Sequence, residues 1–351
     1  MILTVGKFVT ILITRPPKPP LMGRFFLSSW SPLVICIKPD KIKRSSDMEL
    51  GQHIKGRVID MKEEHEFRIV ITPFCNYRCF FCHSEGFIKE STPLLLSPAD
   101  YGFVAKAAKE LWGWDTLTIT GGEPLISPIY RETCEAIAKE GVRITTVTNA
   151  SLISSPKKIL AHNSQINVSL HSMDPDVYRR ITCITYPLNQ VIDTIISVRS
   201  FYPEMAIHLN ATVIRGVNDK PEDMDKLINF ATRVEGEAKF IDLASSNKQL
   251  IVPCEEIEER LVAIGFSKVD EGKWRSIFER GSEHTSITRC GFAEQNSARG
   301  DRNLFLNPDG TVASDDDRGK LSMSLLREIH ERDLDSFAKK VEWYFPPAKR
   351  I

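Results

Sequence analysis

The fold is decided by one stretch of the sequence, FRIVITPFCNYRCFFCH, which occupies residues 67–83. It begins with Phe67–Thr72, a run rich in β-branched side chains that predicts a strand. Three cysteines follow with the spacing CxxxCxxC: Cys75, Cys79 and Cys82. Thiolates are soft ligands, and three on one loop can hold three corners of an iron–sulfur cube while one iron stays open for chemistry. The stretch therefore predicts a strand followed directly by a metal-binding loop.

The sequence leaves other roles for these cysteines open. A structural zinc site would need His83 as its fourth ligand, although the neighbouring side chains of Cys82 and His83 tend to diverge. A single catalytic thiol or a disulfide is a further alternative. The chain has 8 cysteines in 351 residues, fewer than a secreted disulfide scaffold would carry, which favours a reducing compartment.

Strand-like and helix-like segments alternate on the C-terminal side of this stretch. The expected strands are Phe67–Thr72, Thr116–Thr120, Val142–Val147, Ile166–Leu170, Ala206–Ile214 and Ala238–Leu243. The expected helices are 97–112, Pro128–Glu140, Asp174–Ile181, Leu188–Phe201 and Pro221–Val234. About six β/α units in succession predict an α/β protein with a parallel sheet and outer helices, either open or curled towards a barrel.

The N-terminal segment differs from this pattern. Residues 1–47 carry eight Lys or Arg against Asp40 and Asp47, together with a proline-rich run. The apolar run Ile2–Ile13 is too short to cross a bilayer, so no stable membrane insertion is expected. We expect residues 1–47 to be a disordered extension, or to precede a true start at Met48.

The C-terminal part also has its own character. Asn307–Gly310 predicts a hairpin turn, and helices are expected at Met323–Arg332 and Leu334–Trp343. Beyond the extension, we therefore divide the chain into a barrel domain (48–245) and a C-terminal hairpin and helical extension that covers the substrate (246–351).

Charge and composition exclude several classes of protein. Lys plus Arg and Asp plus Glu each number 46, so the net charge is zero and binding to a nucleic acid polymer is not expected. Hydrophobic residues make up 42% and charged residues 26%, which fits a soluble globular protein rather than a disordered or membrane protein. With the reducing compartment that the cysteines indicate, this predicts a cytoplasmic location.

A second motif ends the second expected strand: Thr120-Gly121-Gly122-Glu123-Pro124. Glycines let the backbone approach a ligand closely, and the acid could hold an ammonium group, although such a segment is often only a turn. Together with CxxxCxxC and the aromatic residue before its third cysteine, this motif resembles the signature of the radical S-adenosylmethionine (SAM) superfamily.

The resemblance implies that Cys75, Cys79 and Cys82 hold a [4Fe–4S] cluster. SAM would bind its open iron and be cleaved to methionine and a 5′-deoxyadenosyl radical, which abstracts hydrogen from a substrate. An electron donor such as flavodoxin or ferredoxin would reduce the cluster. The implied cofactor contacts are Phe81, Gly121, Gly122, Glu123, Pro124, Thr148, Asn149 and Ser169. Without the resemblance, Asn149 would fit a turn residue and Ser169 a satisfied core hydroxyl.

Four further segments resemble one branch of the superfamily, the molybdenum-cofactor GTP 3′,8-cyclases: residues 75–86, 167–175, 215–219 and 239–243. This narrower resemblance implies a partial, TIM-like (β/α)6 barrel with the cluster at its C-terminal mouth. It also implies substrate contacts at Arg68 and at His208, which stands where the branch has a lysine. Arg68 could equally form a surface ion pair, and His208 could be structural.

The sequence departs from this branch near its C-terminus. The branch binds a second cluster there through three cysteines, and the matching positions here are Ala298, Asp301 and Asp315. None of these is a thiol. We therefore predict a single cluster, and the recognition of GTP that the second cluster assists is in doubt.

The sequence also has fewer of the cationic side chains with which this branch binds a triphosphate. Thr116 and Thr118 replace a lysine and an arginine, whereas Arg299 and Arg302 could contact a phosphate or carboxylate. We expect a small polar substrate that is less charged than GTP, such as a nucleotide, nucleoside or sugar phosphate, and that cyclises or rearranges. The alternatives are a genuine GTP 3′,8-cyclase, a peptide-modifying radical SAM enzyme, and a non-catalytic zinc or iron–sulfur protein.

Overall fold

The structure is a computed structural model of the 351-residue chain. It describes residues 67–82, 84, 89–272, 274–290, 303–314 and 322–344, and the backbone of five short strands nearer the N-terminus. The chain forms two compact units, Met1–Leu50 and Gly51–Ile351, which we describe separately.

The first unit contains a three-stranded antiparallel sheet in the order β1–β2–β3. Its strands are Ile2–Val5, Phe8–Ile11 and Cys36–Ile37. The sequence analysis predicted no strand here, and the role of residues 1–47 as an extension stays a prediction. The second unit begins with another short antiparallel pair, β4 (His53–Ile54) and β5 (Arg57–Val58).

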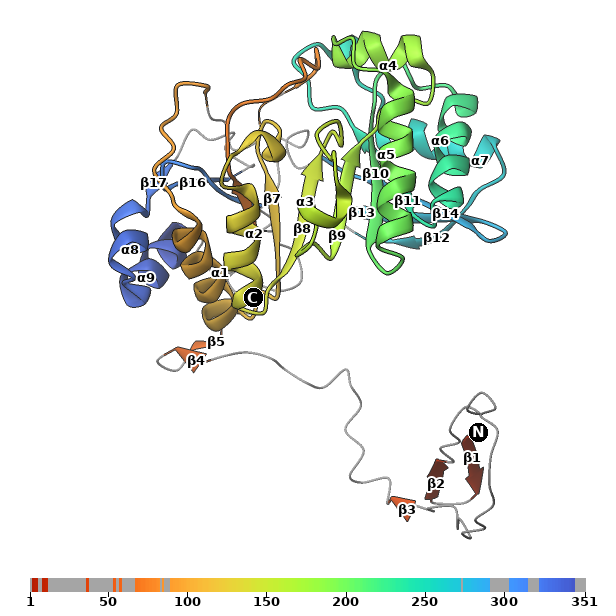
Figure 1. Ribbon diagram of the computed structural model, residues 1–351. Coiled ribbons are helices and arrows are strands. Elements are labelled where there is room, and N and C mark those ends of the chain that lie inside the picture. Colours follow the sequence, from red (N-terminus) through yellow and green to blue (C-terminus); the bar gives the residue numbers. More distant parts are fainter. Residues whose placement is uncertain are drawn as a thin grey trace, which may run out of the picture. The chain divides into compact units, whose positions relative to one another are not determined.

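Six parallel strands form the centre of the second unit (Figure 1). They are β6 (Phe67–Val70), β7 (Thr116–Thr120), β8 (Arg143–Thr148), β9 (Gln165–Ser169), β10 (Ala206–Val213) and β11 (Glu237–Asp242). They lie side by side in chain order, and every neighbouring pair is parallel. All of the strands expected in this region are confirmed, with some ends shifted by a residue or two.

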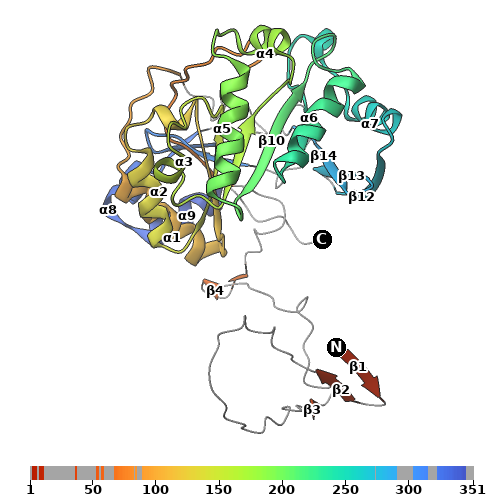
Figure 2. The ribbon, with the colours of Figure 1, turned by 45° about the vertical axis from the view of Figure 1, so that its right-hand side comes forward.

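Helices connect these strands, and α1, α2, α5 and α6 lie over the same face of the sheet (Figures 1 and 2). The connecting elements are α1 (Pro98–Trp112), the 3-10 helix η4 (Pro124–Ile126), α2 (Tyr130–Lys139), α3 (Pro156–Ile159), α4 (Pro175–Thr182), α5 (Leu188–Phe201) and α6 (Pro221–Arg233). Helix α1 begins where the sequence predicts, because Ser97 and Asp100 form a capping box. The repeat of strand and helix confirms the expected α/β architecture.

Outward-facing side chains of the strands pack against these helices in two hydrophobic clusters. Ile69 and Leu117 belong to the cluster under α1 and α2. Leu209 and Phe240 belong to the cluster under α5 and α6. Because side chains alternate along a strand, the residues between these point to the opposite, inner face of the sheet.

The inner face is mostly polar, with Val70, Val147 and Ile241 as apolar members. It carries Arg68, Thr118, Thr145, Gln165, Asn167, Ser169, His208, Asn210, Glu237 and Lys239. Burying polar groups costs free energy unless they are hydrogen-bonded, so a wall of this composition is typical of a surface that faces a polar ligand. We call these residues the inner wall.

The C-terminal part extends both edges of the same sheet. After η5 (Lys248–Leu250) and α7 (Cys254–Ala263), strands β12 (Ser267–Glu271), β13 (Arg275–Arg280) and β14 (Glu283–Thr288) join the β11 edge. Strands β15 (Leu304–Leu306), β16 (Thr311–Ser314) and β17 (Met323–Ser324) join the β6 edge, and are followed by α8 (Leu326–Glu331) and α9 (Leu334–Tyr344). The residues on both sides of position 245 therefore contribute strands to one sheet. A functional division at residue 245 stays a prediction.

The predicted hairpin at Asn307–Gly310 is confirmed between β15 and β16. The expected helix start at Met323 is wrong, because Met323 and Ser324 pair with β16 as a strand and the helix begins at Leu326. The hairpin β12–β13 had no strong signal in the sequence. All residues of β12 are exposed, so it lacks the alternation that marks a half-buried strand.

Candidate functional site

The cysteine loop leaves the C-terminal end of β6 and rests on the end of β7. The N–H of Gly122 donates to the carbonyl of Thr72 (2.9 Å), and that of Glu123 donates to the carbonyl of Phe74 (2.7 Å). A Cβ on Gly122 would lie 2.2 Å from the Phe74 oxygen, and one on Gly121 would lie 2.5 Å from the Thr72 oxygen. The glycines therefore allow the two sequence motifs to pack together, a role that the sequence analysis did not assign to them.

The other side of the loop is held by α4. The N–H of Phe80 donates to the carbonyl of Ile181 (3.2 Å) near the end of this helix. The buried hydroxyl groups of Tyr77 and Tyr178 lie 2.7 Å apart and form a hydrogen bond. The loop is thus fixed at two separate places, the end of β7 and helix α4.

The three thiols of this loop lie near one another in different environments. Cys75 and Cys82 are exposed, whereas Cys79 is half-buried. Burial raises the pKa of Cys79 to about 12, and the nearby Cys82 and Cys75 add to this effect. Among the described residues, no three Cys, His, Asp or Glu side chains converge on the position of a single metal ion. Three soft donors on one anchored loop fit an iron–sulfur cluster, whose iron would stabilise the thiolates.

Glu123 lies inside the protein. Its Oε1 accepts hydrogen bonds from Thr148 Oγ1 (2.7 Å) and Leu125 N (3.2 Å), and its Oε2 accepts one from Asn149 N (2.7 Å). Burial raises its pKa to about 7, and these hydrogen bonds oppose that effect. The carboxyl group joins the ends of β7 and β8, whereas the sequence analysis offered it as a ligand for an ammonium group.

Asn149 connects the end of β8 to the cysteine loop. Its Nδ2 donates to Asn76 Oδ1 (2.8 Å), and Asn76 Nδ2 donates to Ser151 Oγ (2.8 Å). The Asn149 side chain also opposes the rise in the pKa of Cys75 that burial causes. Asn149 and Thr148 therefore lie at the expected rim, but their observed contacts are with the protein. The sequence analysis did not identify Asn76, because the residue between two cysteines carries no local signal of its partner.

Phe81 is half-buried beside a small apolar cluster that contains Ile214 and Leu243. Its ring meets the ring of His171 edge-on, with 5.0 Å between centroids. His171 Nδ1 accepts a hydrogen bond from the N–H of Thr212 (3.2 Å), and burial lowers the pKa of His171 to about 4. A neutral imidazole, which the sequence analysis did not assign to the site, therefore supports Phe81. Contact between Phe81 and adenine stays a prediction.

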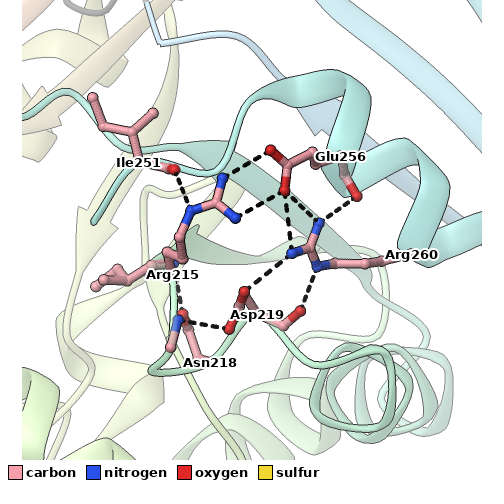
Figure 3. A network of polar contacts seen from close by, with 8 residues as sticks. Arg215, Asn218, Asp219, Ile251, Glu256 and Arg260 are labelled. Carbon is pink, nitrogen blue, oxygen red and sulfur yellow. Dashed lines mark hydrogen bonds and ion pairs between the residues drawn. The ribbon is translucent and has the colours of Figure 1, made fainter. Parts of the chain in front are cut away.

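The loop after β10 is fastened to α7 by two arginines (Figure 3). Arg215 donates from both Nη atoms to the carboxylate of Glu256 (3.0 and 2.8 Å). Arg260 connects the backbone carbonyl of Glu256 (2.7 Å) with the side chain of Asp219 (3.1 Å). Forked contacts of this kind fix orientation as well as distance, so this loop forms a defined part of the rim.

Two predicted substrate contacts lie on the inner wall. The Arg68 guanidinium is 5.9 Å from the centroid of the Phe305 ring. His208 Nδ1 lies 3.0 Å from Gln165 Nε2, and its Nε2 lies 3.8 Å from a Glu237 oxygen. Burial lowers the pKa of His208 to about 4, so the imidazole is neutral and its contact with Glu237 is not an ion pair. His208 therefore does not supply the charge of the lysine that it replaces.

The expected cofactor contacts gather at one rim of the sheet. The cysteine loop follows β6, Gly121–Pro124 follow β7, Thr148 and Asn149 end β8, and Ser169 ends β9. The carboxyl ends of adjacent parallel strands meet at the same edge, which is where ligands bind in such folds.

Other predicted positions lie outside the described residues. They are Arg299 and Arg302, and the three positions matched to a second cluster, Ala298, Asp301 and Asp315. The absence of a second cluster and the anion contacts of these arginines stay predictions.

Comparison with known proteins relates the chain to one family. Residues 69–231 match the radical SAM superfamily. This segment, a little under half of the chain, contains the cysteine loop and is similar to that superfamily of enzymes. It is 32% identical to a "Probable GTP 3′,8-cyclase" of Pyrobaculum aerophilum over 209 residues, covering 57% of this chain and 66% of the relative. It is 29% identical to a protein of the same description from Thermococcus kodakarensis over 272 residues, covering 74% and 84%.

Solved structures show the same fold. Streptococcus suis SuiB bound to S-adenosylmethionine matches 80% of this chain and 66% of its own, with a TM-score of 0.58 and 13% identity. Native anSMEcpe with bound AdoMet matches 77% of this chain and 80% of its own, with a TM-score of 0.51 and 12% identity. Identities this low support the partial TIM-like barrel and nothing more specific. Within the described part of the chain, no helix combines the length and apolar character needed to cross a membrane.

Proposed function

We propose that this protein uses Cys75, Cys79 and Cys82 to hold one [4Fe–4S] cluster and cleaves SAM reductively. The observation that carries the proposal is the packing of the cysteine loop on Gly121 and Gly122 at the carboxyl end of the parallel strands. When bound, the cluster and SAM supply a 5′-deoxyadenosyl radical that abstracts hydrogen from a substrate.

The residues of the rim would position SAM. The half-buried ring of Phe81, supported by His171, offers an apolar surface for adenine. Because the Glu123 carboxyl group is used within the protein, the backbone of Gly121–Pro124 is the better candidate for the methionyl end. Ser169, at the end of β9, offers a hydroxyl on the same side.

The inner wall favours a small polar substrate over a triphosphate. His208 is neutral and Thr118 is uncharged, so two positions at which the GTP cyclases have cations lack charge here. A nucleoside, a nucleotide with few phosphates or a sugar phosphate fits this wall better, and cyclisation or rearrangement is the expected outcome. The partners of the enzyme would be this substrate and an electron donor such as flavodoxin or ferredoxin.

A second candidate function is GTP 3′,8-cyclisation itself. The names of the similar proteins from Pyrobaculum aerophilum and Thermococcus kodakarensis favour it. It predicts conversion of GTP by the reduced enzyme and a second cluster, so iron content and GTP turnover separate the two candidates.

Anaerobic reconstitution tests the proposed function. We expect about four iron and four sulfide per chain, and formation of 5′-deoxyadenosine from SAM after reduction with dithionite. A screen with deuterium-labelled nucleosides, nucleotides and sugar phosphates would then follow the label into 5′-deoxyadenosine. Zinc without iron, or iron without SAM cleavage, would refute the proposal. About eight iron per chain would refute the single cluster.

The variant Cys79→Ala identifies the ligands. It should lose both the cluster and SAM cleavage, because a cube bound by two thiolates is not held stably. Cys254→Ala is the matched control, since Cys254 is a half-buried cysteine at the start of α7 and does not belong to the cysteine loop. Retention of cluster or cleavage in Cys79→Ala would contradict the ligand assignment.

A further inference from the structure

Asn210 lies on the inner wall, midway along β10. Its neighbours along β10, Leu209 and Ala211, pack outward into the hydrophobic core. Across the sheet, Asn210 is in register with Ser169 of β9 on one side and with Lys239 of β11 on the other. It therefore stands between a proposed contact of SAM and a cationic side chain.

The Asn210 side chain holds a buried acceptor that the protein does not use. Its Oδ1 is shielded from solvent and has no hydrogen-bond partner. Within the described strands β6–β11, no other side-chain nitrogen or oxygen atom is both buried and unpartnered. Native proteins pair nearly all such atoms, so an exception on a ligand-facing wall indicates a group that awaits a partner.

Asn167 provides the contrast. It is the same residue type on the same face, one strand away and further from the rim. Its Oδ1 accepts a hydrogen bond from Gln165 Nε2 (2.8 Å), and Gln165 also contacts His208 (3.0 Å). Further from the rim, the side chains of the inner wall therefore hydrogen-bond one another. The unpaired acceptor lies nearer the rim, level with Ser169.

We propose that Asn210 Oδ1 accepts a hydrogen bond from the exocyclic amino group of a nucleobase in the substrate. The proposal rests on the proposed function, which places a nucleoside-like molecule in the barrel. Asparagine amides read the amino groups of bases in nucleic-acid complexes by the same chemistry. The surroundings favour a neutral donor, because His208 is neutral and Glu237 is already bonded to Arg275 and Ser286.

Two matched leucine substitutions separate a ligand-binding role from a structural one. Asn210→Leu replaces an unpaired buried acceptor by an apolar side chain of similar volume, so the unfolding midpoint of the ligand-free protein should stay the same or rise. Asn167→Leu breaks a formed hydrogen bond and should lower the midpoint by about 2–4 °C. An equal loss in Asn210→Leu would assign Asn210 to the structure and overturn the proposal.

Titration with nucleosides tests whether Asn210 accepts a hydrogen bond from an exocyclic amino group. The reconstituted full chain with SAM is titrated with adenosine, guanosine and cytidine, which carry an exocyclic amino group, and with inosine and uridine, which lack one. The wild-type protein should bind an amino nucleoside about tenfold more tightly than its amino-free counterpart, and Asn210→Leu should lose this preference. The proposal is contradicted by equal wild-type affinities, by an unchanged preference in Asn210→Leu, or by no binding at all.

SAM cleavage by dithionite-reduced wild-type protein is measured in the same samples. If SAM is not cleaved, the proposed function fails, while the two unfolding midpoints and the nucleoside preference still report on Asn210. If SAM is cleaved without any preference for amino nucleosides, the inference about Asn210 fails alone.

Discussion

Gly122 lies where the cysteine loop touches the end of β7, and it leaves no room for a side chain. In Gly122→Ala the new Cβ would lie 2.2 Å from the carbonyl oxygen and 2.4 Å from the carbonyl carbon of Phe74. Backbone must therefore move. We expect a loss of stability of about 1–3 kcal/mol and, because the displaced segment leads into Cys75, markedly less iron per chain after reconstitution. Urea unfolding and iron analysis measure the two effects.

Gly102→Ala is the control for this substitution. Gly102 lies within α1, and its added Cβ would meet Ala136 at 3.4 Å, close to ordinary contact. Alanine is the better helix former, so stability should be unchanged or rise by up to about 1 kcal/mol. Full iron content in Gly122→Ala would show that the glycine is not needed to position the loop.

The sequence indicated which types of residue form the site, but not which residues contact one another there. The spacing of Cys75, Cys79 and Cys82 lies within one loop and is visible without a structure. The roles of Glu123 and Asn76 are not, because their partners Asn149 and Ser151 lie 26 and 75 residues further along the chain. Contacts of this range depend on the order of the strands, which local patterns do not specify.

At the scale of elements, Asp100 links the start of α1 to the C-terminal helices. Its carboxylate accepts hydrogen bonds from Ser97 N (2.7 Å) and from Arg332 Nη1 (2.6 Å), and His330 lies 3.8 Å away. Burial by itself would raise the pKa of Asp100, but the hydrogen bonds from Ser97 and Arg332 outweigh it and lower the pKa. One side chain thus serves both a helix cap and a contact between distant elements.

This lowered pKa predicts how stability depends on pH. Because the folded pKa lies below the unfolded value of about 3.9, the contribution is fully present above about pH 4 and is lost as the pH falls through the folded pKa. Asp100→Asn should therefore cost about 1–3 kcal/mol at pH 7, and the difference from wild type should shrink towards pH 3. Urea unfolding across this range measures it.

Asp115→Asn is the matched control for charge. Asp115 pairs with Arg143 at 3.3 Å, and both side chains are more than half exposed. Exposed pairs contribute little, so the variant should differ from wild type by less than about 1 kcal/mol. A loss in Asp100→Asn that did not change with pH would point to the cap geometry alone.

Strands with buried side chains were predicted from the sequence, whereas an exposed strand was not. Strands β6 to β11 carry runs of buried β-branched and aliphatic residues between helices with clear starts such as Ser97-Pro98, and all were predicted. Strand β12 is exposed throughout, and its register shifts between Lys268 and Asp270. A strand held mainly by backbone pairing has no hydrophobic pattern to read, which is why the hairpin β12–β13 was missed.

At the scale of the whole second unit, the C-terminal part completes the barrel core. Phe337 of α9 is fully buried, and its ring lies 5.8 Å from Phe103 and 6.2 Å from Trp112, both of α1. Strand β15 pairs with β6, the strand that leads into the cysteine loop. The division at residue 245 was drawn where the alternation of strands and helices in the sequence ends. The packing indicates that the segments on both sides of it unfold together.

Phe337→Ala tests this cooperativity. Truncating a buried phenylalanine should cost about 3–5 kcal/mol and shift tryptophan fluorescence and far-UV circular dichroism to lower denaturant together, because a shared core unfolds as one unit. Trp343→Ala on the same helix is the control, since Trp343 is 77% exposed and its loss should change stability by less than about 0.5 kcal/mol. Two separate transitions in Phe337→Ala would instead establish an independent C-terminal domain, one that could cover a bound substrate by moving against a barrel that stays folded.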